Sequence, residues 1–388
     1  MRVLKFGGSS VANPECIEKT LSIVRETETP GLVGVSAMGG ITDLLLEAAR
    51  EAALHDNSWR ERLEIIENRH LDAIRELLPI AGQAPVLSKV KKEANTLETL
   101  LEGSFLIGET TTKLLDRILS FGELMSSYII ASYYQSQGLK AKFQDSRALI
   151  RTDNSYGKAN VDQEVTRSLI TDSLDGKDPV VILPGFVASN TEGHTTTLGR
   201  GGSDYSAALF AAATGAERLE IWTDVSGMFT ANPKLVKEAR PISLLSYEEA
   251  MELSNFGAKV LYPPTIQPVL QKGIPLTIRN TFAPGDPGTR IEANGNQEGR
   301  TVRGISHVPE IGLLSLEGPG MVGIPGISKR FFEVLSEKQV NIVFITQASS
   351  EHSICVGIAE TQLGLASTEV NKCFSYEISK GEINPVIV

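Results

Sequence analysis

Lys5 stands near the end of a short apolar segment, and Gly7 and Gly8 follow it closely. Glycines let backbone N–H groups approach phosphate oxygens, and Ser9 adds a hydroxyl. A lysine beside them can stabilise the charge of a phosphoryl group during its transfer. The spacing matches neither a Walker A loop nor a dinucleotide-binding fingerprint. Taken alone, the segment is more typical of a tight turn beside a surface lysine.

A second glycine-rich segment, 199–204, reads Gly-Arg-Gly-Gly-Ser-Asp and precedes a run of small residues typical of a helix. Helix N-termini favour anions through their free N–H groups and their dipole. Arg200 offers a planar fork that suits a carboxylate. Ser203 is predicted to cap the helix, and Asp204 falls in its first turn, where a charge–dipole role is the alternative to a functional one. The glycines around Arg200 favour function.

Two further segments place polar groups where a ligand could bind. Thr223 and Asp224 follow an apolar strand, and in open α/β sheets the residues just beyond the strand ends line the ligand crevice. Lys259 lies shortly after Gly257. Read in isolation, the first segment is an ordinary turn and Lys259 is a solvated lysine.

Strand-like and helix-like segments alternate over 1–290, which predicts an α/β fold with a mostly parallel sheet sandwiched by helices. Asn13 and Pro14 are typical of a helix start, and the pattern at 246–249 is a capping box. Residues 57–105 have helical spacing and predict a helical hairpin inserted between core strands. The expected strands are 3–6, 31–38, 140–145, 179–189, 195–198, 218–225 and 275–281.

Residues 283–300 are rich in Pro, Gly and polar side chains and indicate a domain boundary. We predict a catalytic domain over 1–290, a linker over 291–310 with a strand at 302–307, and a second domain over 311–388. The second domain reads β-α-β-β-α-β, the ferredoxin-like order. Its expected strands are 311–317, 342–347, 353–359 and 385–388, and its expected helices are 326–338 and 365–376.

The composition excludes several classes of function. A net charge of −10 leaves no electrostatic footprint for nucleic acid, and the chain has no apolar run of about 18 residues that could span a membrane. The 3 cysteines lack CxxC spacing, which argues against disulfides and structural zinc and fits a reducing, cytoplasmic location. The 5 histidines lie outside the motifs, and His70 falls on an apolar helical stripe, where a packing role is expected.

Several motifs occur together in this chain: Lys-Phe-Gly-Gly-Ser at 5–9, Val-Ser-Ala at 35–37, Phe-Gly-Glu-Leu-Met-Ser at 121–126, Gly-Arg-Gly-Gly-Ser-Asp-Tyr at 199–205, Trp-Thr-Asp at 222–224 and Phe-Gly-Ala-Lys-Val at 256–260. In this combination the chain resembles the amino-acid kinase superfamily and, within it, the aspartate kinases, over almost its whole length. The likeness is greatest to the N-terminal half of bifunctional aspartate kinase–homoserine dehydrogenases. Residues 340–351 resemble their regulatory ACT unit.

The resemblance implies an amino-acid kinase fold with a C-terminal ACT domain. It also implies an ATP-dependent aspartate kinase. Such an enzyme transfers the γ-phosphoryl group to the β-carboxylate of L-aspartate, giving 4-phospho-L-aspartate, the first step of threonine, lysine and methionine biosynthesis. ATP and Mg²⁺ are the implied cofactors. The acceptor needs no general base, because a carboxyl with a pKa of about 3.9 is already ionised at neutral pH.

The resemblance also assigns roles to the residues that match the family motifs. Glu123 is expected to pair with the ammonium of aspartate and Arg200 with its α-carboxylate. The implied set is Lys5 and Asp204 at the reacting centre; Ser36, Thr42, Glu123, Arg200 and Ser203 around aspartate; and Gly7, Gly8, Ser9, Thr223, Asp224, Phe229, Lys234 and Lys259 around the nucleotide.

The chain departs from the commonest family pattern at a few positions. Phe229, Asn232 and Lys234 stand where many relatives have tyrosine, aspartate and arginine. Phe229 can stack on adenine without donating a hydroxyl hydrogen bond, and Lys234 lacks a bidentate fork. These changes bear on nucleotide affinity more than on activity. Tyr262 replaces a frequent histidine, with no consequence that we derive.

Two alternatives remain at this point. The first is another enzyme of the superfamily that phosphorylates glutamate, acetylglutamate or a nucleotide; Arg200 together with Glu123 favours a zwitterionic amino acid over a nucleotide. The second is a non-catalytic amino-acid sensor, which would require the loss of Lys5 or Asp204, and both residues are present.

The ACT resemblance implies regulation. Asn341, Ile342 and Gln347 are expected to hold an amino-acid effector, threonine or lysine, at an interface between ACT units. Such contacts would join chains into a homodimer or a higher homo-oligomer. Relatives usually carry two ACT units, whereas this sequence contains one. We therefore expect it to be part of a longer protein, with impaired feedback inhibition.

Overall fold

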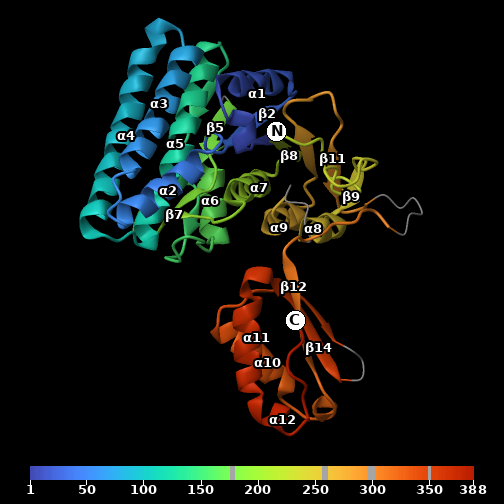
Figure 1. Cartoon of the computed structure of the whole chain (residues 1–388). Helices are drawn as coiled ribbons and strands as arrows, with labels where there is room; N and C mark the ends of the chain where they lie inside the picture. Colours follow the sequence, from blue (N-terminus) through green and yellow to red (C-terminus); the bar gives the residue numbers. More distant parts are fainter. Residues whose placement is uncertain (175–179, 256–260, 296–301, 348–350) are drawn as a thin grey trace. The chain divides into compact units, whose positions relative to one another are not determined.

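The computed structural model describes residues 1–174, 180–255, 261–295, 302–347 and 351–388 (Figure 1). The chain forms two compact units, Met1–Ser306 and His307–Val388. Among the described residues, no helix combines the length and the apolar character needed to cross a membrane.

The first unit is built on an eight-stranded sheet in the order β3-β5-β2-β1-β8-β10-β11-β9. All neighbours from β3 to β10 pair in parallel, and only the β10–β11 pair is antiparallel. This arrangement confirms the predicted mostly parallel sheet. Its strands are β1 (Arg2–Phe6), β2 (Pro30–Val35), β3 (Ala141–Phe143), β5 (Val180–Pro184), β8 (Arg218–Thr223), β9 (Leu244–Ser246), β10 (Leu276–Asn280) and β11 (Thr289–Glu292).

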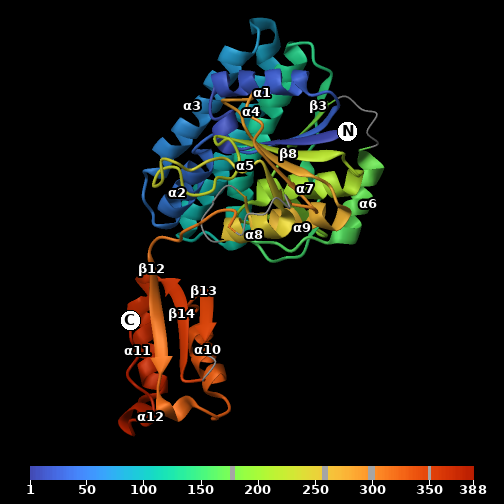
Figure 2. The ribbon, with the colours of Figure 1, turned by 90° about the vertical axis from the view of Figure 1, so that its right-hand side faces the viewer.

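Helices cover both faces of this sheet, and α1 and α7 lie on opposite sides of it (Figure 2). The alternation of side chains along β1 explains the two cores: Leu4 and Phe6 pack with α1 to α5, whereas Val3 packs with α6 to α9. Lys5 shares the face of Val3. The helices are α1 (Pro14–Glu26), α2 (Ile41–Ala53), α3 (Trp59–Leu77), α4 (Ile80–Ile107), α5 (Thr112–Ser136), α6 (Gln163–Ser173), α7 (Gly202–Thr214), α8 (Tyr247–Asn255) and α9 (Pro263–Lys272).

The inserted helical hairpin forms as predicted. Helices α3 and α4 pack on α2 and α5, so the four helices lie side by side (Figure 1). His70 is fully buried on α3, where its Nδ1 is 2.7 Å from the carbonyl oxygen of Ile66. Burial lowers the pKa of His70 to about 4, so the ring is neutral at physiological pH and packs as an uncharged core residue.

The prediction of a single strand at 179–189 is wrong. The chain leaves the large sheet after β5, turns at Phe186 with φ of 61°, and continues as β6 (Val187–Asn190) in a small second sheet. There β6 pairs with β4 (Arg151–Thr152) and with β7 (Thr195–Thr197). The predicted hairpin turn is confirmed: the Asn190 side-chain oxygen accepts from the backbone N–H groups of Glu192 and His194.

Two predicted helix starts are confirmed by their hydrogen bonds. The Asn13 side chain accepts from the backbone N–H of Cys16, with Pro14 as the first residue of α1. Ser246 and Glu249 form a reciprocal capping box, with N···O distances of 2.8 and 3.0 Å.

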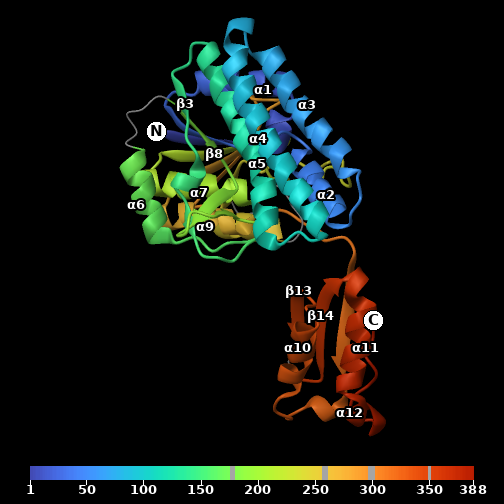
Figure 3. The same cartoon turned by 90° about the vertical axis from the view of Figure 1, so that its left-hand side faces the viewer.

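The second unit has a three-stranded sheet in the order β12-β14-β13, with α10 and α11 packed on one face (Figure 3). The segment 385–388, expected to be a strand, pairs with β12 only through a single β-bridge, between Ser315 and Ile387. Residues 302–307, expected to supply a strand, pair with no strand among the described residues; the Ile305 N–H donates to Thr230 O instead. The elements are β12 (Ile311–Glu317), α10 (Ile327–Glu337), β13 (Ile342–Gln347), β14 (Ser353–Ala359), α11 (Leu363–Cys373) and α12 (Ser375–Ser379).

Candidate active site

A cavity of about 450 Å³ opens where β1, β2 and β5 end at the same edge of the large sheet. Parallel strands place their following residues together at this edge, which is the usual ligand crevice of such sheets. The cavity brings together eight of the residues singled out from the sequence: Lys5, Gly8, Ser36, Thr42, Glu123, Arg200, Ser203 and Asp204.

Lys5 forms an ion pair across this cavity. Its Nζ lies 2.5 Å from Oδ1 of Asp204, which stands in the first turn of α7. Lys5 is only 7% exposed, and its place on the α7 face of β1 follows from the strand alternation. A half-buried carboxylate beside it holds the ammonium group in place. The pair therefore presents a fixed cation to the cavity.

Two helix N-termini also line the cavity, and neither has a side-chain cap. Gly201 precedes α7 with φ of 71°, and Gly40 precedes α2 with φ of 78°. The predicted capping role of Ser203 is wrong, because the helix begins one residue earlier and the Ser203 hydroxyl donates to Glu123 instead. N–H groups without a capping side chain leave both termini suited to anions.

Glu123, on α5, is a buried carboxylate with one oxygen in use. Its Oε1 accepts from Ser203 Oγ at 2.6 Å, while Oε2 has no hydrogen-bond partner among the described residues. Burial raises the pKa of Glu123 to about 8, against the opposing effects of Ser203 and Lys5. A positively charged ligand group would both pair Oε2 and bring the carboxyl back to its ionised form.

Arg200 is exposed in the loop that leads into α7. Within the part of the chain that the structure describes, it makes no hydrogen bond or ion pair. Arg200 lines the cavity, and its guanidinium suits a carboxylate in the bidentate geometry that arginine favours.

The residues expected around the nucleotide are only partly brought to this cavity. Phe6 of β1 pairs with Trp222 of β8, so Gly7 directly follows β1 beside Thr223, the last residue of β8. The Gly7 N–H donates to Trp222 O at 3.0 Å. Ser9 lies in the 3-10 turn Gly8–Val11, and the Thr223 hydroxyl donates to the Asp224 carboxylate. Phe229 forms an isolated β-bridge with Pro241, and Lys234 is exposed. None of Thr223, Asp224, Phe229 and Lys234 lines the 450 Å³ cavity, and Lys259 lies outside the described residues.

Sequence reasoning assigned no functional role to several residues that line the cavity: Met38, Gly39, Gly40, Asp43 and Phe186. The glycine pair after β2 was a usable signal for the first group, because it marks a turn at a strand end. Phe186 had no such signal, since its positive φ depends on the switch of the chain from one sheet to the other.

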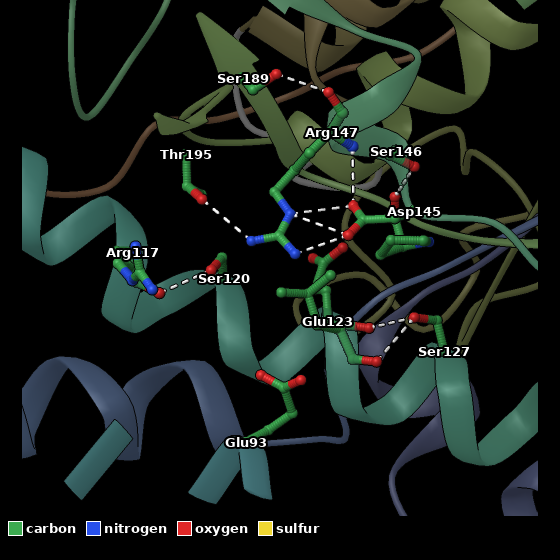
Figure 4. Close-up of polar contacts among 12 residues, drawn as sticks. Glu93, Arg117, Ser120, Glu123, Ser127, Asp145, Ser146, Arg147, Ser189 and Thr195 are labelled. Atoms are coloured by element: carbon green, nitrogen blue, oxygen red, sulfur yellow. Dashed lines mark hydrogen bonds and ion pairs between the residues drawn. The ribbon is translucent and has the colours of Figure 1, made fainter. Parts of the chain in front are cut away.

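Arg147 joins the small sheet to the end of β3 through polar contacts (Figure 4). The guanidinium of Arg147 donates to Asp145 through Nε and Nη2 and to Thr195 Oγ1 at 3.2 Å. Its carbonyl oxygen accepts from Ser189 Oγ at 2.6 Å. These bonds join the end of β3 to β6 and β7, which lead into the Arg200 loop.

The second unit holds a separate cavity of about 300 Å³ beside the start of α10. Gln347 lines it, and the Gly323 N–H that faces it donates to the Glu351 carboxylate at 3.1 Å. Asn341 and Ile342 are at the opposite end of β13 and do not line it.

Comparison with known proteins places this architecture in a family. Residues 1–280 match the amino acid kinase family, and residues 314–374 match an ACT domain. The lysine-sensitive aspartokinase 3 of Escherichia coli is 33% identical, over 92% of this chain and 78% of its own length. The crystal structure of E. coli aspartokinase III in complex with aspartate and ADP matches with a TM-score of 0.82 and 31% identity, over 92% of this chain and 78% of that one.

The bifunctional aspartokinase/homoserine dehydrogenase of Haemophilus influenzae is 34% identical over 100% of this chain but only 48% of its own length. The chain thus spans about half the length of the bifunctional relatives that it matches. It belongs to the amino acid kinase family and, within it, to the aspartokinases.

Proposed function

We propose that this chain is an ATP-dependent aspartate kinase that transfers the γ-phosphoryl group to the β-carboxylate of L-aspartate. One observation carries the proposal. A single cavity combines a fixed cation, two helix N-termini without side-chain caps, an arginine, and a buried carboxylate with one oxygen unpaired among the described residues. This set suits a ligand with two carboxylates and one ammonium next to a polyphosphate. The complex of E. coli aspartokinase III with aspartate and ADP supports the same substrates.

Each end of aspartate has a matching group in the cavity. Its ammonium would pair with Glu123 Oε2, and its α-carboxylate with Arg200. Ser36, Thr42 and Ser203 would donate hydroxyl hydrogen bonds around it. This placement leaves the β-carboxylate directed toward Lys5, where the phosphoryl group must arrive.

The reaction is then a direct transfer that depends on positioning. A β-carboxylate oxygen attacks the γ-phosphorus, the bond from that phosphorus to the bridging oxygen breaks, and the electron pair leaves with ADP. No proton has to be removed, because the acceptor is already ionised. Lys5 would stabilise the charge on the transferring group, and Asp204 would hold Lys5 in place.

The nucleotide would bind beside the ends of β1 and β8, next to Gly7 and Thr223. The residues that the family resemblance assigns to it are Gly7, Gly8, Ser9, Thr223, Asp224, Phe229, Lys234 and Lys259. The described residues hold no cluster of three or more His, Cys, Asp or Glu side chains that could bind a metal alone. That fits Mg²⁺, which usually binds through nucleotide phosphates and one or two carboxylates. When bound, Mg²⁺ would neutralise phosphate charge.

A hydroxamate assay tests the proposed activity. With MgATP and hydroxylamine, L-aspartate should give aspartyl hydroxamate, which forms a coloured complex with ferric iron, together with an equal amount of ADP. Glutamate, acetylglutamate and nucleoside monophosphates, the acceptors of related kinases, serve as comparisons. Product from one of these acceptors and not from aspartate would contradict the proposal, and binding of aspartate without any product would favour an amino-acid sensor.

Gly185 offers a test of the substrate site, because a side chain there has no room. A Cβ atom would lie 2.6 Å from Ser203 Cβ and 3.0 Å from Glu123 Oε2. We expect Gly185→Ala to raise KM for aspartate by about tenfold and to leave KM for ATP nearly unchanged. Gly103→Ala is the matched control, since a Cβ at Gly103 meets nothing within 4 Å. An unchanged KM for aspartate in Gly185→Ala would argue against this placement of the substrate.

We further propose that the 300 Å³ cavity of the ACT unit binds a free amino acid, threonine or lysine, and that Asn341 and Ile342 contribute at an interface with a second chain. The unpaired outer edge of β13, within the described residues, suits a homodimer or a higher homo-oligomer. Gln347→Ala should abolish any inhibition by the effector while the uninhibited rate stays the same. Inhibition that survives this substitution would exclude the cavity.

A further inference from the structure

Asp116, on α5, is a buried carboxylate that the reaction described above does not use. It is 1% exposed and accepts hydrogen bonds from two separate segments. The Gly157 N–H lies 3.0 Å from both of its oxygens, the Thr197 N–H lies 3.0 Å from Oδ2, and Thr197 Oγ1 lies 2.7 Å from Oδ1. All of these partners donate hydrogen bonds, so the side chain at position 116 must be an acceptor without an N–H group.

Asp116 and Glu123 are seven residues apart on the same helix. Two turns of an α-helix take nearly seven residues, so both carboxylates lie on one face, about 10 Å apart along the axis. Glu123 binds Ser203, and Asp116 binds Thr197. One face of α5 therefore holds both ends of the segment 197–203, and this segment contains Arg200.

The other partner of Asp116 supports the middle of the same segment. A Cβ atom at Gly199 would lie 3.2 Å from Gly157 O and 3.1 Å from Lys158 Cγ, so the Gly157 turn packs directly against Gly199. Gly199 has φ of 70° and immediately precedes Arg200. By fixing Gly157, Asp116 fixes the surface on which the Arg200 loop rests.

We propose that Asp116 is a positioning residue that sets the place of Arg200, and thereby the affinity for the α-carboxylate of the amino-acid substrate. It does not line the cavity and acts only through Thr197 and Gly157. The inference rests on the proposed function. It predicts an effect on the amino acid and none on the nucleotide, because the segment that Asp116 holds is on the aspartate side of the cavity.

The test is steady-state kinetics of Asp116→Asn in the full chain, by coupled ADP release. Asparagine keeps the shape but turns an amide N–H toward the donors. KM for aspartate should rise by about tenfold or more, with KM for ATP within about twofold of its original value. Thr197→Val removes the hydroxyl bond to Asp116 and should raise KM for aspartate by about threefold, whereas Thr197→Ser keeps the hydroxyl and should restore the original value.

Asp162→Asn is the matched control. Asp162 also accepts a hydrogen bond from a backbone N–H, that of Val165 at 3.0 Å, but it is exposed at the start of α6 and has no bond to Gly157 or to segment 197–203. It should leave KM for aspartate unchanged. Equal rises in both KM values of Asp116→Asn, or an equal effect of Asp162→Asn, would overturn the proposal in favour of a general structural role.

The proposed function and the role of Asp116 can fail separately. If the unaltered chain shows no aspartate-dependent ADP release, the proposed function fails and this inference fails with it. If the unaltered chain is active and Asp116→Asn keeps its KM for aspartate, only the inference on Asp116 fails. If circular dichroism shows that Asp116→Asn does not fold, the comparison of Thr197→Val with Thr197→Ser replaces it. Equal KM values for aspartate in these two variants would overturn the proposal.

Discussion

Lys5→Met should lower kcat on the order of a thousandfold or more, with the fold intact. The ammonium of Lys5 is fixed by Asp204 at 2.5 Å in a cavity where two anions must meet. Methionine keeps much of the apolar stem and removes the charge. What is lost is the cation that stabilises the transferring phosphoryl group, so the effect should fall on kcat more than on either KM.

Lys19→Met is the matched control for this substitution. Lys19 also pairs with a carboxylate, Glu15, at 2.7 Å, but on the exposed face of α1. Its kcat should equal that of the unaltered chain, because exposed pairs contribute little. Circular dichroism and thermal unfolding check the fold of both variants. Near-normal turnover in Lys5→Met would remove Lys5 from the reaction.

Glu123→Gln should raise KM for aspartate by about a hundredfold and leave KM for ATP nearly unchanged. Glutamine fills the same space and can still accept from Ser203, but it offers no charge to the substrate ammonium. Glu220→Gln is the control: Glu220 is another buried carboxylate, 1% exposed, and it lines a separate cavity of about 110 Å³ beside Trp222. Equal losses of affinity for aspartate and ATP in Glu123→Gln would contradict the ammonium assignment.

The raised pKa of Glu123 gives this prediction a pH dependence. With a pKa of about 8 in the empty cavity, Glu123 is mostly protonated at neutral pH and must lose its proton when the ammonium binds. KM for aspartate should therefore fall by up to about tenfold per pH unit as the pH rises toward 8, and then level off. In Glu123→Gln this dependence should be absent.

The unfolding free energy should fall as the pH rises, whereas the affinity for aspartate should increase. The folded state holds a proton on Glu123 that the unfolded state releases near the ordinary glutamate pKa of 4.5, so the unfolding free energy contributed by this group falls as the pH rises from 4.5 to about 8. The advantage of Glu123→Gln in thermal unfolding over the unaltered chain should grow across this window. A constant difference would show that the carboxyl titrates normally.

The sequence was sufficient for the elements whose signals are local. The short apolar segment followed by Gly7 and Gly8 placed Lys5 near a strand end, and the helical spacing of α3 and α4 predicted the inserted hairpin with His70 packed inside it. Asn13, Ser246 and the Asn190 turn were readable because their hydrogen bonds reach only two to four residues along the chain.

The sequence failed where residues distant along the chain determine the local structure or the hydrogen bonds of a side chain. Ser203 has the right type for a helix cap, but its hydroxyl donates to Glu123, 80 residues away in sequence. The apolar run at 179–189 predicts one strand, yet the chain divides it between two sheets at Phe186. Asp116 had no signal at all, because its partners come from segments 41 and 81 residues away.

The central claim is that a carboxylate oxygen of aspartate attacks phosphorus directly inside the cavity. Aspartate labelled with heavy oxygen in its β-carboxylate tests this claim. After turnover with MgATP, hydroxylamine attacks the acyl carbon of the product and releases phosphate, which mass spectrometry then weighs. Our account predicts that this phosphate carries one heavy oxygen from aspartate. Release of unlabelled phosphate only, formed by attack of water on ATP, would contradict it.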